Sequence, residues 1–149
     1  MPDLNMPFNE MNAEQFQAHL DQRSVNTHDA EAVARWFAPD GVQRRVATAE
    51  VAQGRDAVRE GVAALFRAFP DFHVRVRDLF TAGDRTCAEC TYTGTHKGDF
   101  AGIAATGRPI EVDGCYVFRW NKDGLAQEEN IYFDNATILM QLGVLPGAS

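Results

Sequence analysis

Polar and aromatic side chains alternate in the segment that precedes the C-terminal helix expected of this sequence. Glu128, Asn130, Tyr132 and Asp134 are spaced two residues apart, so in an extended strand they share one face, and the intervening residues, Glu129 among them, share the other. A carboxyl in an apolar cavity loses hydration, which raises its pKa and lets it exchange protons near neutral pH. The pattern therefore predicts a general acid/base at Asp134.

Hydrogen-bond donors are expected beside this carboxyl. Tyr132, Tyr116 or His96 would hydrogen-bond an oxygen on which negative charge develops. We expect aromatic side chains, several of them with polar tips, to line an apolar ligand cavity. The side-chain amide of Asn130, on the same strand as Tyr132, is expected to join them. The residues predicted to bind substrate are Trp36, Phe66, Phe69, Tyr92, Tyr116, Phe118 and Asn130.

Each of these residues also has a structural interpretation. Asp134 precedes the expected helix and could simply cap it, because Asp is a favoured N-cap. His96 lies in a Gly-Thr-His turn, where a histidine more often hydrogen-bonds a loop than catalyses a reaction. The tyrosines are more often core residues with a satisfied hydroxyl. Position alone leaves both interpretations of Asp134 open.

Cysteine spacing does not predict a metal centre or a redox pair. Cys87 and Cys90 form a CxxC sequence in an extended segment, where their odd offset places them on opposite faces. A second CxxC or a pair of histidines that would complete a zinc site is missing from the sequence. We therefore expect free thiols and no metal.

The elements that must position these residues follow from hydrophobic periodicity. Helices are expected first, over Asn12 to Arg23, Ala30 to Phe37 and Ala57 to Ala68, with a closing helix over Asn135 to Leu142. Strands are expected over 42–46, from 72 onward, and over 86–96, 109–121 and 125–133, with a loop over 47–53. This order predicts an α+β fold, in which three N-terminal helices pack on a curved, mainly antiparallel sheet.

Length and composition bound the organisation and the partners. The 149 residues fit a single domain over 1–149, with residues 1–11 as a loose N-terminal tail. A net charge of −7 disfavours nucleic acid and anionic membrane surfaces as partners. The sequence has no apolar run long enough to span a bilayer, and its first residues lack the basic and apolar regions of a signal peptide, so a cytoplasmic location is expected.

Several short motifs, taken together in order and spacing, resemble those of the SnoaL-like polyketide cyclases. The resemblance covers about residues 12–146 and rests on Asn26-Thr27-His28-Asp29, Phe69-Pro70-Asp71-Phe72, Gly94-Thr95-His96-Lys97-Gly98 with Gly102 and Thr106-Gly107-Arg108, Tyr132-Phe133-Asp134, and Gln141-Leu142-Gly143.

The resemblance implies a cystatin-like cone, homodimers formed through the open sheet face, and a cofactor-independent reaction. In the cyclases an aspartate at the position of Asp134 exchanges protons during an intramolecular aldol ring closure, and a histidine tends to lie two residues before it, where this chain has Tyr132. The expected function is thus acid/base chemistry on a small hydrophobic carbonyl compound, by a polyketide cyclase or a related isomerase. The alternatives are a non-catalytic ligand-binding cone protein, or a related hydroxylase, dehydratase or epoxide hydrolase.

Overall fold

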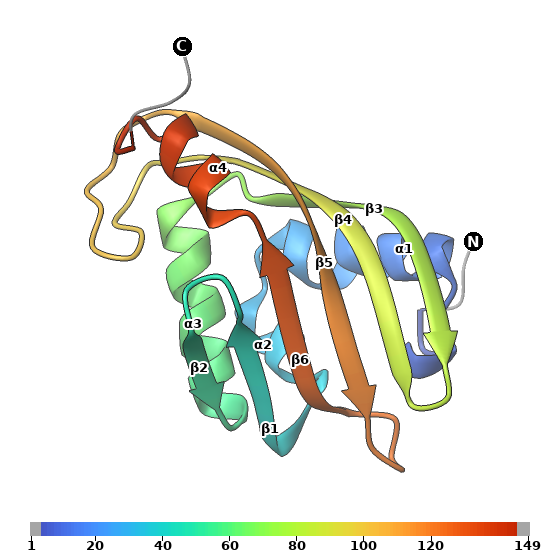
Figure 1. The fold of residues 1–149 in the computed structure, drawn as a ribbon. Coiled ribbons are helices and arrows are strands. Elements are labelled where there is room, and N and C mark those ends of the chain that lie inside the picture. Colours follow the sequence, from blue (N-terminus) through green and yellow to red (C-terminus); the bar gives the residue numbers. More distant parts are fainter. Residues whose placement is uncertain (1–3, 146–149) are drawn as a thin grey trace.

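Residues 4–145 are described by a computed structural model, in which helices cover one face of a curved, open sheet (Figure 1). In chain order the elements are the 3-10 helix η1 (Phe8–Glu10), α1 (Ala13–Arg23), the 3-10 helix η2 (Val25–Thr27), α2 (Ala30–Ala34), β1 (Phe37–Arg45), β2 (Glu50–Gln53), α3 (Arg55–Ala68), β3 (His73–Ala82), β4 (Arg85–Thr95), β5 (Pro109–Trp120), β6 (Ala126–Phe133) and α4 (Asn135–Gln141). The predicted α+β class, with helices before hairpins, is confirmed.

The sheet has six strands in the order β2-β1-β6-β5-β4-β3. Every neighbouring pair is antiparallel except β1 and β6, which run parallel. Chain-consecutive hairpins build the β3-β4-β5-β6 half, and β6 then pairs with a strand almost 90 residues earlier. That long-range pairing is what brings side chains of β1 beside those of the last strand.

Two boundaries differ from those expected. The second helix ends at Ala34 rather than Phe37, and β1 begins at Phe37. Pairing with β6 accounts for this, because Phe37 is the register partner of Ala126 and the Ala126 amide donates to the Trp36 carbonyl at 2.7 Å. The loop expected over 47–53 contains β2, which pairs with β1 at residues 42–45.

The N-terminal segment packs against the body from residue 4 onward, in contrast to the loose tail expected over 1–11. Leu4 and Met11 are buried, and the ring of Phe8 lies 5.0 Å from Trp36 and 6.3 Å from Trp120 between centroids. Removing these apolar side chains from water favours the packed state. Residues 1–3 of the expected tail lie outside the described residues.

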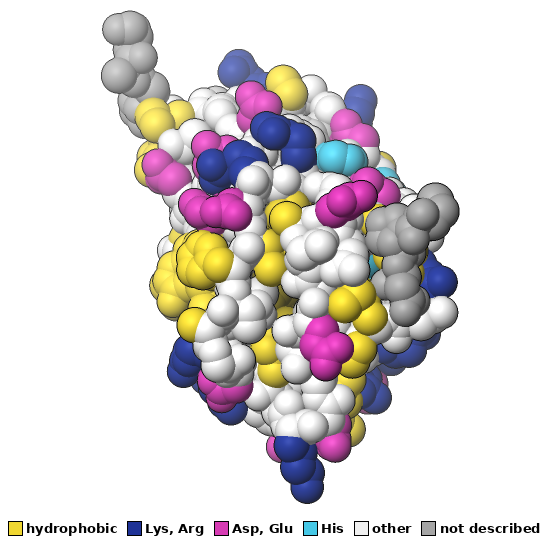
Figure 2. Space-filling model, turned by 90° about the vertical axis from the view of Figure 1, so that its right-hand side faces the viewer, with side chains coloured by type: hydrophobic (Ala, Val, Ile, Leu, Met, Phe, Trp, Pro, Cys, Tyr) yellow, Lys and Arg dark blue, Asp and Glu magenta, His cyan; other side chains and the backbone are white. Residues whose placement is uncertain are grey.

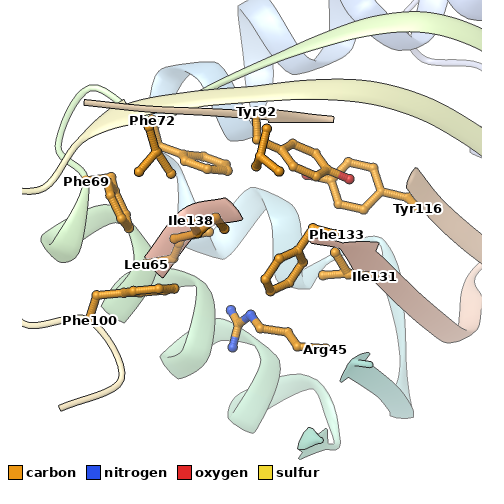
Figure 3. Close-up of a pocket in the computed structure, with 12 residues that line it drawn as sticks. Arg45, Leu65, Phe69, Phe72, Tyr92, Phe100, Tyr116, Ile131, Phe133 and Ile138 are labelled. Atoms are coloured by element: carbon orange, nitrogen blue, oxygen red, sulfur yellow. The ribbon is translucent and has the colours of Figure 1, made fainter. Parts of the chain in front are cut away.

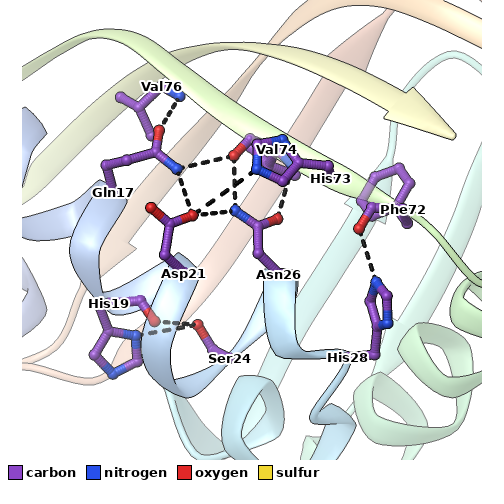
Figure 4. Close-up of polar contacts among 10 residues, drawn as sticks. All are labelled: Gln17, His19, Asp21, Ser24, Asn26, His28, Phe72, His73, Val74 and Val76. Atoms are coloured by element: carbon purple, nitrogen blue, oxygen red, sulfur yellow. Dashed lines mark hydrogen bonds and ion pairs between the residues drawn. The ribbon is translucent and has the colours of Figure 1, made fainter.

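Strand β3 lies at the edge of the sheet, and two polar side chains occupy its free backbone groups (Figure 4). Asn26 accepts a hydrogen bond from the Val74 amide at 2.8 Å and donates one to the Val74 carbonyl at 3.0 Å. Gln17 accepts from the Val76 amide at 2.6 Å and also donates to the Val74 carbonyl. These amides take the place of a further strand, which protects the edge from pairing with another chain.

The core fills the space between the helices and the concave side of the sheet. Helix α3 contributes an apolar stripe at the spacing of one helix face, and the inward rows of β4 and β5 face it. The largest fully buried aromatic side chains are Phe16, Phe37, Phe69 and Phe118. Part of the interior is not filled by the core side chains. Two small cavities remain there, and they define the candidate site.

Candidate functional site

Two small adjoining cavities lie between α3 and the sheet. The first, here called the apolar cavity, has a volume of about 60 Å³ and is shown in Figure 3; it is lined by Arg45, Leu65, Phe69, Phe72, Tyr92, Phe100, Ile110, Val112, Tyr116, Ile131, Phe133 and Ile138. The second, here called the Glu129 cavity, has a volume of about 40 Å³ and is lined by Val25, Val33, Trp36, Gln43, Arg45, Val62, Leu65, Phe66, Phe72, Tyr116, Glu129 and Ile131. The lists share five residues, so the cavities are neighbours in one interior.

Glu129 is the carboxyl of this interior. It projects from β6 directly opposite Phe118 of β5, and its side chain is only 2% exposed. On its other side Gln43 of β1 is its register partner, and the Gln43 Nε2 donates a hydrogen bond of 2.8 Å to the Glu129 Oε1. The parallel pairing of β1 with β6 therefore supplies the partner that lets a carboxyl be buried here.

The environment raises the pKa of Glu129 from its ordinary value of 4.5 to about 7. Burial is the largest cause, because the charged form loses its hydration; the Gln43 hydrogen bond and the positive charge of Arg45 oppose the shift. A carboxyl with a pKa near neutrality is suited to both take and return a proton under cellular conditions.

Arg45 lines both cavities from β1, and its guanidinium reaches the interior (Figure 3). Its Nη1 lies 3.5 Å from the Glu50 Oε2, and its Nη2 donates to the Gly61 carbonyl at 3.4 Å. The side chain is 17% exposed. Glu50 thus balances the charge of Arg45, which leaves Glu129 held mainly by the neutral Gln43.

Two tyrosines face the cavities from neighbouring strands. Tyr92 lines the apolar cavity and Tyr116 lines both, with ring centroids 5.4 Å apart (Figure 3). Burial raises the pKa of each phenol well above its ordinary value. Both hydroxyls therefore keep their protons at physiological pH and can donate hydrogen bonds.

The predicted strand phase of the last strand is wrong, and Asn130, Tyr132 and Asp134 do not face the cavities. Tyr116 pairs with Ile131 and Phe118 with Glu129, so the inward row of β6 is Glu129, Ile131 and Phe133. Tyr132 is 43% exposed, and the Asn130 Nδ2 donates to the Glu128 Oε1 at 3.1 Å on the outer face. Ile131 and Phe133 explain the observed phase, since burying them is more favourable than burying Asn130 and Asp134.

Asp134 is fully exposed and caps α4, which is the alternative that the sequence left open. Its Oδ2 accepts a hydrogen bond of 2.8 Å from the Thr137 hydroxyl, and its Oδ1 accepts one of 3.2 Å from the Thr137 amide. These hydrogen bonds, the hydroxyl first, hold the pKa of Asp134 below its ordinary value. An exposed carboxyl of lowered pKa in this position does not meet the conditions for proton exchange inside the cavity.

His96 is fully buried, but it lines neither cavity. Its Nδ1 lies 2.9 Å from the Thr106 hydroxyl and accepts from the Thr106 amide at 3.2 Å, while its ring packs 5.5 Å from that of Phe69. Its backbone also bonds to Gly107 and Arg108. The side chain and backbone of His96 hold the two ends of the 96–108 loop together, as the loop interpretation predicted.

The remaining predicted substrate-binding residues lie in or beside the cavities. Phe69, Tyr92 and Tyr116 line the apolar cavity, and Trp36, Phe66 and Tyr116 line the Glu129 cavity. Phe118 is fully buried in the core opposite Glu129.

Sequence reasoning missed the three polar lining residues Gln43, Arg45 and Glu129. Glu129 could have been found from its sequence neighbours, because it is in phase with Ile131 and Phe133. A charged residue in an otherwise apolar row signals a buried ionisable group. Gln43 and Arg45 depended on the parallel pairing with β6, which strand patterns alone do not predict.

Neither a cluster of metal ligands nor a membrane-spanning helix occurs in the part of the chain that the structure describes. Among residues 4–145, His, Cys, Asp and Glu side chains form no group of three or more that could hold a metal ion. No helix among these residues is both long enough and apolar enough to cross a membrane. Cys87, Cys90 and Cys115 are free thiols, and Cys90 is buried while Cys87 is not.

Comparisons with known proteins agree with this architecture. The chain is similar to IdmH of Streptomyces antibioticus, described as a polyketide cyclase (29% identity, TM-score 0.70, covering 90% of this chain and all of that one). It is similar in fold to a SnoaL-like polyketide cyclase of Jannaschia sp. CCS1 (18%, TM-score 0.78, 98% and 99%) and to AclR of Streptomyces galilaeus, described as a hydroxylase (24%, TM-score 0.75, 93% and 87%). No curated protein sequence matches the chain.

The family model for SnoaL-like polyketide cyclases matches residues 13–142, which contain every strand of the sheet, both cavities and α4. The family predicted from the short motifs is thereby confirmed, and the chain belongs to the SnoaL-like polyketide cyclase family.

Proposed function

We propose that this protein is a cofactor-independent acid/base enzyme acting on a small hydrophobic carbonyl compound, with Glu129 as the group that exchanges protons. The observation that supports this most strongly is a carboxyl 2% exposed, in a cavity lined mostly by apolar side chains, with a pKa raised to about 7. The role predicted for Asp134 moves to the opposite face of the same strand.

The proposed step begins with the charged Glu129 carboxylate. It takes a proton from the carbon next to a carbonyl, so that the C–H bond breaks, an O–H bond forms on Glu129, and the electron pair moves onto the carbonyl oxygen. Tyr116, which shares the cavity and keeps its proton, would hydrogen-bond the resulting enolate. Return of the proton at another carbon gives isomerisation. In aldol cyclisation the enolate carbon forms a C–C bond to a second carbonyl of the same molecule, and the alkoxide produced takes the proton back from Glu129.

Gln43 suits both protonation states of Glu129. With Glu129 charged, the amide donates through Nε2, as observed. The Gln43 Oε1 is buried and has no partner among the described residues. When Glu129 carries the proton, rotation of the amide would let that oxygen accept the carboxylic O–H. A primary amide can serve both states because it carries a donor and an acceptor on one rigid plane.

The experiment that tests this function is solvent exchange in D₂O. The protein is incubated with 1-tetralone, a rigid apolar ketone, and loss of the α-proton signal is followed by NMR against buffer alone. We expect exchange to accelerate with the wild-type protein and to return to the buffer rate in Glu129→Gln. Exchange no faster than buffer, with ketone bound, would identify a ligand carrier instead.

Homodimer formation through the outer sheet face is also part of the proposal. The strand register places Phe80, Cys87 and Val117 side by side on that face, with Tyr132 in the next row. Asn130 and Arg44 separate this apolar group from Val51 at the far edge of the sheet. Phe80 and Val51 are more than half exposed. In Figure 2, hydrophobic side chains gather along the left margin, the side of the sheet that faces the viewer in Figure 1. Such a surface on a soluble domain is typical of an interface.

We expect the wild-type protein to sediment as a dimer and Val117→Lys to sediment as a monomer, because a charge beside the apolar Cys87 and Phe80 is costly to bury. Sedimentation equilibrium measures both masses, and Glu111→Lys, an exposed position near the start of β5 on the same sheet face, serves as the control that should remain a dimer. A monomeric wild-type protein at about 100 µM, well above the dissociation constants of stable interfaces, would contradict the dimer.

A further inference from the structure

Two hydrogen-bond donors in the cavity lining have no partner. The Trp36 Nε1 and the Tyr92 hydroxyl are buried and make no direct hydrogen bond among the described residues, and the polar neighbour of the Tyr92 hydroxyl is the hydroxyl of Tyr116. Trp36 lines the Glu129 cavity and Tyr92 the apolar cavity, and the two side chains are 2% and 5% exposed. Buried polar atoms of native proteins are nearly always paired, so two orphan donors in one interior require an explanation.

Aromatic rings pack against Trp36 on several sides. It is enclosed by the rings of Phe8, Phe16, Phe118 and His19, with centroids 5.0 to 6.3 Å away. The nearest polar ring, His19, has its Nδ1 bonded to the Ser24 hydroxyl at 3.1 Å. This packing fixes the indole in place, and its N–H makes no hydrogen bond among the described residues.

Tyr92 is held in the same way. Its ring stacks on Phe72, with centroids 6.3 Å apart, and tilts against Tyr116 at 5.4 Å. A phenylalanine would fill the same volume without burying an unpaired hydroxyl. The hydroxyl and the indole N–H therefore lower the stability of the unliganded protein, which indicates a use in the liganded one.

We propose that Trp36 and Tyr92 recognise the ligand, each donating a hydrogen bond to a carbonyl-type oxygen. The ligand is neutral, because the one cationic group that lines the cavities, Arg45, is already paired with Glu50, and the one carboxyl is Glu129. This inference rests on the proposed function, in that the Trp36 donor lies in the lining of the cavity that holds Glu129.

The test uses two probes of nearly the same shape, acetophenone and α-methylstyrene, which differ in having C=O or C=CH₂. Dissociation constants are measured by ligand-observed NMR for the wild type, Trp36→Phe, Tyr92→Phe and the exposed control Tyr132→Phe. We expect the wild type and the control to prefer acetophenone by about fivefold or more, the ratio that one good hydrogen bond supplies. At least one cavity variant should bind both probes about equally, and Tyr92→Phe should melt no lower than the wild type.

Equal binding of the probes by the wild type, no binding of either, or a preference unchanged in both cavity variants would overturn the proposal. If Trp36→Phe does not fold, Tyr92→Phe alone decides. The same measurement in Glu129→Gln separates this proposal from the proposed function. A carbonyl preference that persists in Glu129→Gln supports recognition by Trp36 and Tyr92 independently of the carboxyl. Catalysis is refuted separately, if the wild-type protein shows this preference but does not accelerate α-proton exchange.

Discussion

Glu129→Gln should slow α-proton exchange of 1-tetralone by a factor of about 10²–10⁴, the usual contribution of a positioned general base. Glutamine keeps the shape of the side chain and can still hydrogen-bond Gln43, but it cannot take a proton. The loss should appear in the rate at saturating ketone, with little change in the ketone concentration needed for half saturation, because binding does not use the proton.

The matched control for this prediction is Asp134→Asn on the same strand end. Asp134 is exposed and caps α4 through Thr137, so its substitution should leave the exchange rate within about twofold of the wild type; asparagine is itself a good N-cap. Loss of exchange in Asp134→Asn with retention in Glu129→Gln would return the catalytic role to the position that the motif suggests.

The same Glu129→Gln substitution should stabilise the protein at alkaline pH. The pKa of Glu129 is raised from 4.5 unfolded to about 7 folded, so between these values the folded chain holds a proton that the unfolded chain has lost. The stabilising effect of that proton is complete below 4.5 and is lost as pH rises through 7. At about pH 8 the variant should therefore exceed the wild type by about 1–3 kcal/mol in free energy of unfolding.

Urea denaturation of both proteins at several pH values measures this difference. His19 titrates with the opposite sign, because burial lowers its pKa from 6.5 to about 4, and its contribution is lost as pH falls. It is present in both proteins and cancels in their difference. Glu128→Gln, which removes a partly exposed partner of Arg44, should show no gain at alkaline pH. A gap between wild type and Glu129→Gln that does not change from pH 5 to pH 8 would contradict a titrating Glu129.

The fold was predictable because its determinants are local. The helix caps, the turn-forming Gly and Pro residues and the alternation of apolar and polar residues from 72 onward predict the elements and their order. That order predicts the architecture. β2 was not predictable, because its four residues are mostly exposed and become a strand only by pairing with β1. The start of β1 likewise depended on the pairing of Phe37 with Ala126 of β6, which is distant in the sequence.

The cavity walls were predictable but the acid/base group was not. Aromatic residues such as Tyr92, Tyr116 and Trp36 can be assigned to the interior whichever phase is chosen for the last strand, because their size favours burial. Strand β6 carries polar residues on both faces. Its phase therefore depends on whether burying Ile131 and Phe133 is more favourable than burying Tyr132, and the difference in burial free energy between these two choices is small. The wrong face was then reinforced by Asp134, whose position before a helix serves capping as well as it would serve catalysis.

Titration of Glu129 itself tests the central claim most directly. With ¹³C-labelled glutamate, the side-chain carboxyl resonance that is missing from the Glu129→Gln spectrum belongs to Glu129, and its shift can be followed with pH in the unliganded protein. The buried, Gln43-bonded carboxyl described above predicts a midpoint of about 7. A midpoint near the ordinary value of 4.5 would mean that Glu129 is an ordinary ionised carboxylate, and would contradict its role as the proton-exchanging group of the cavity.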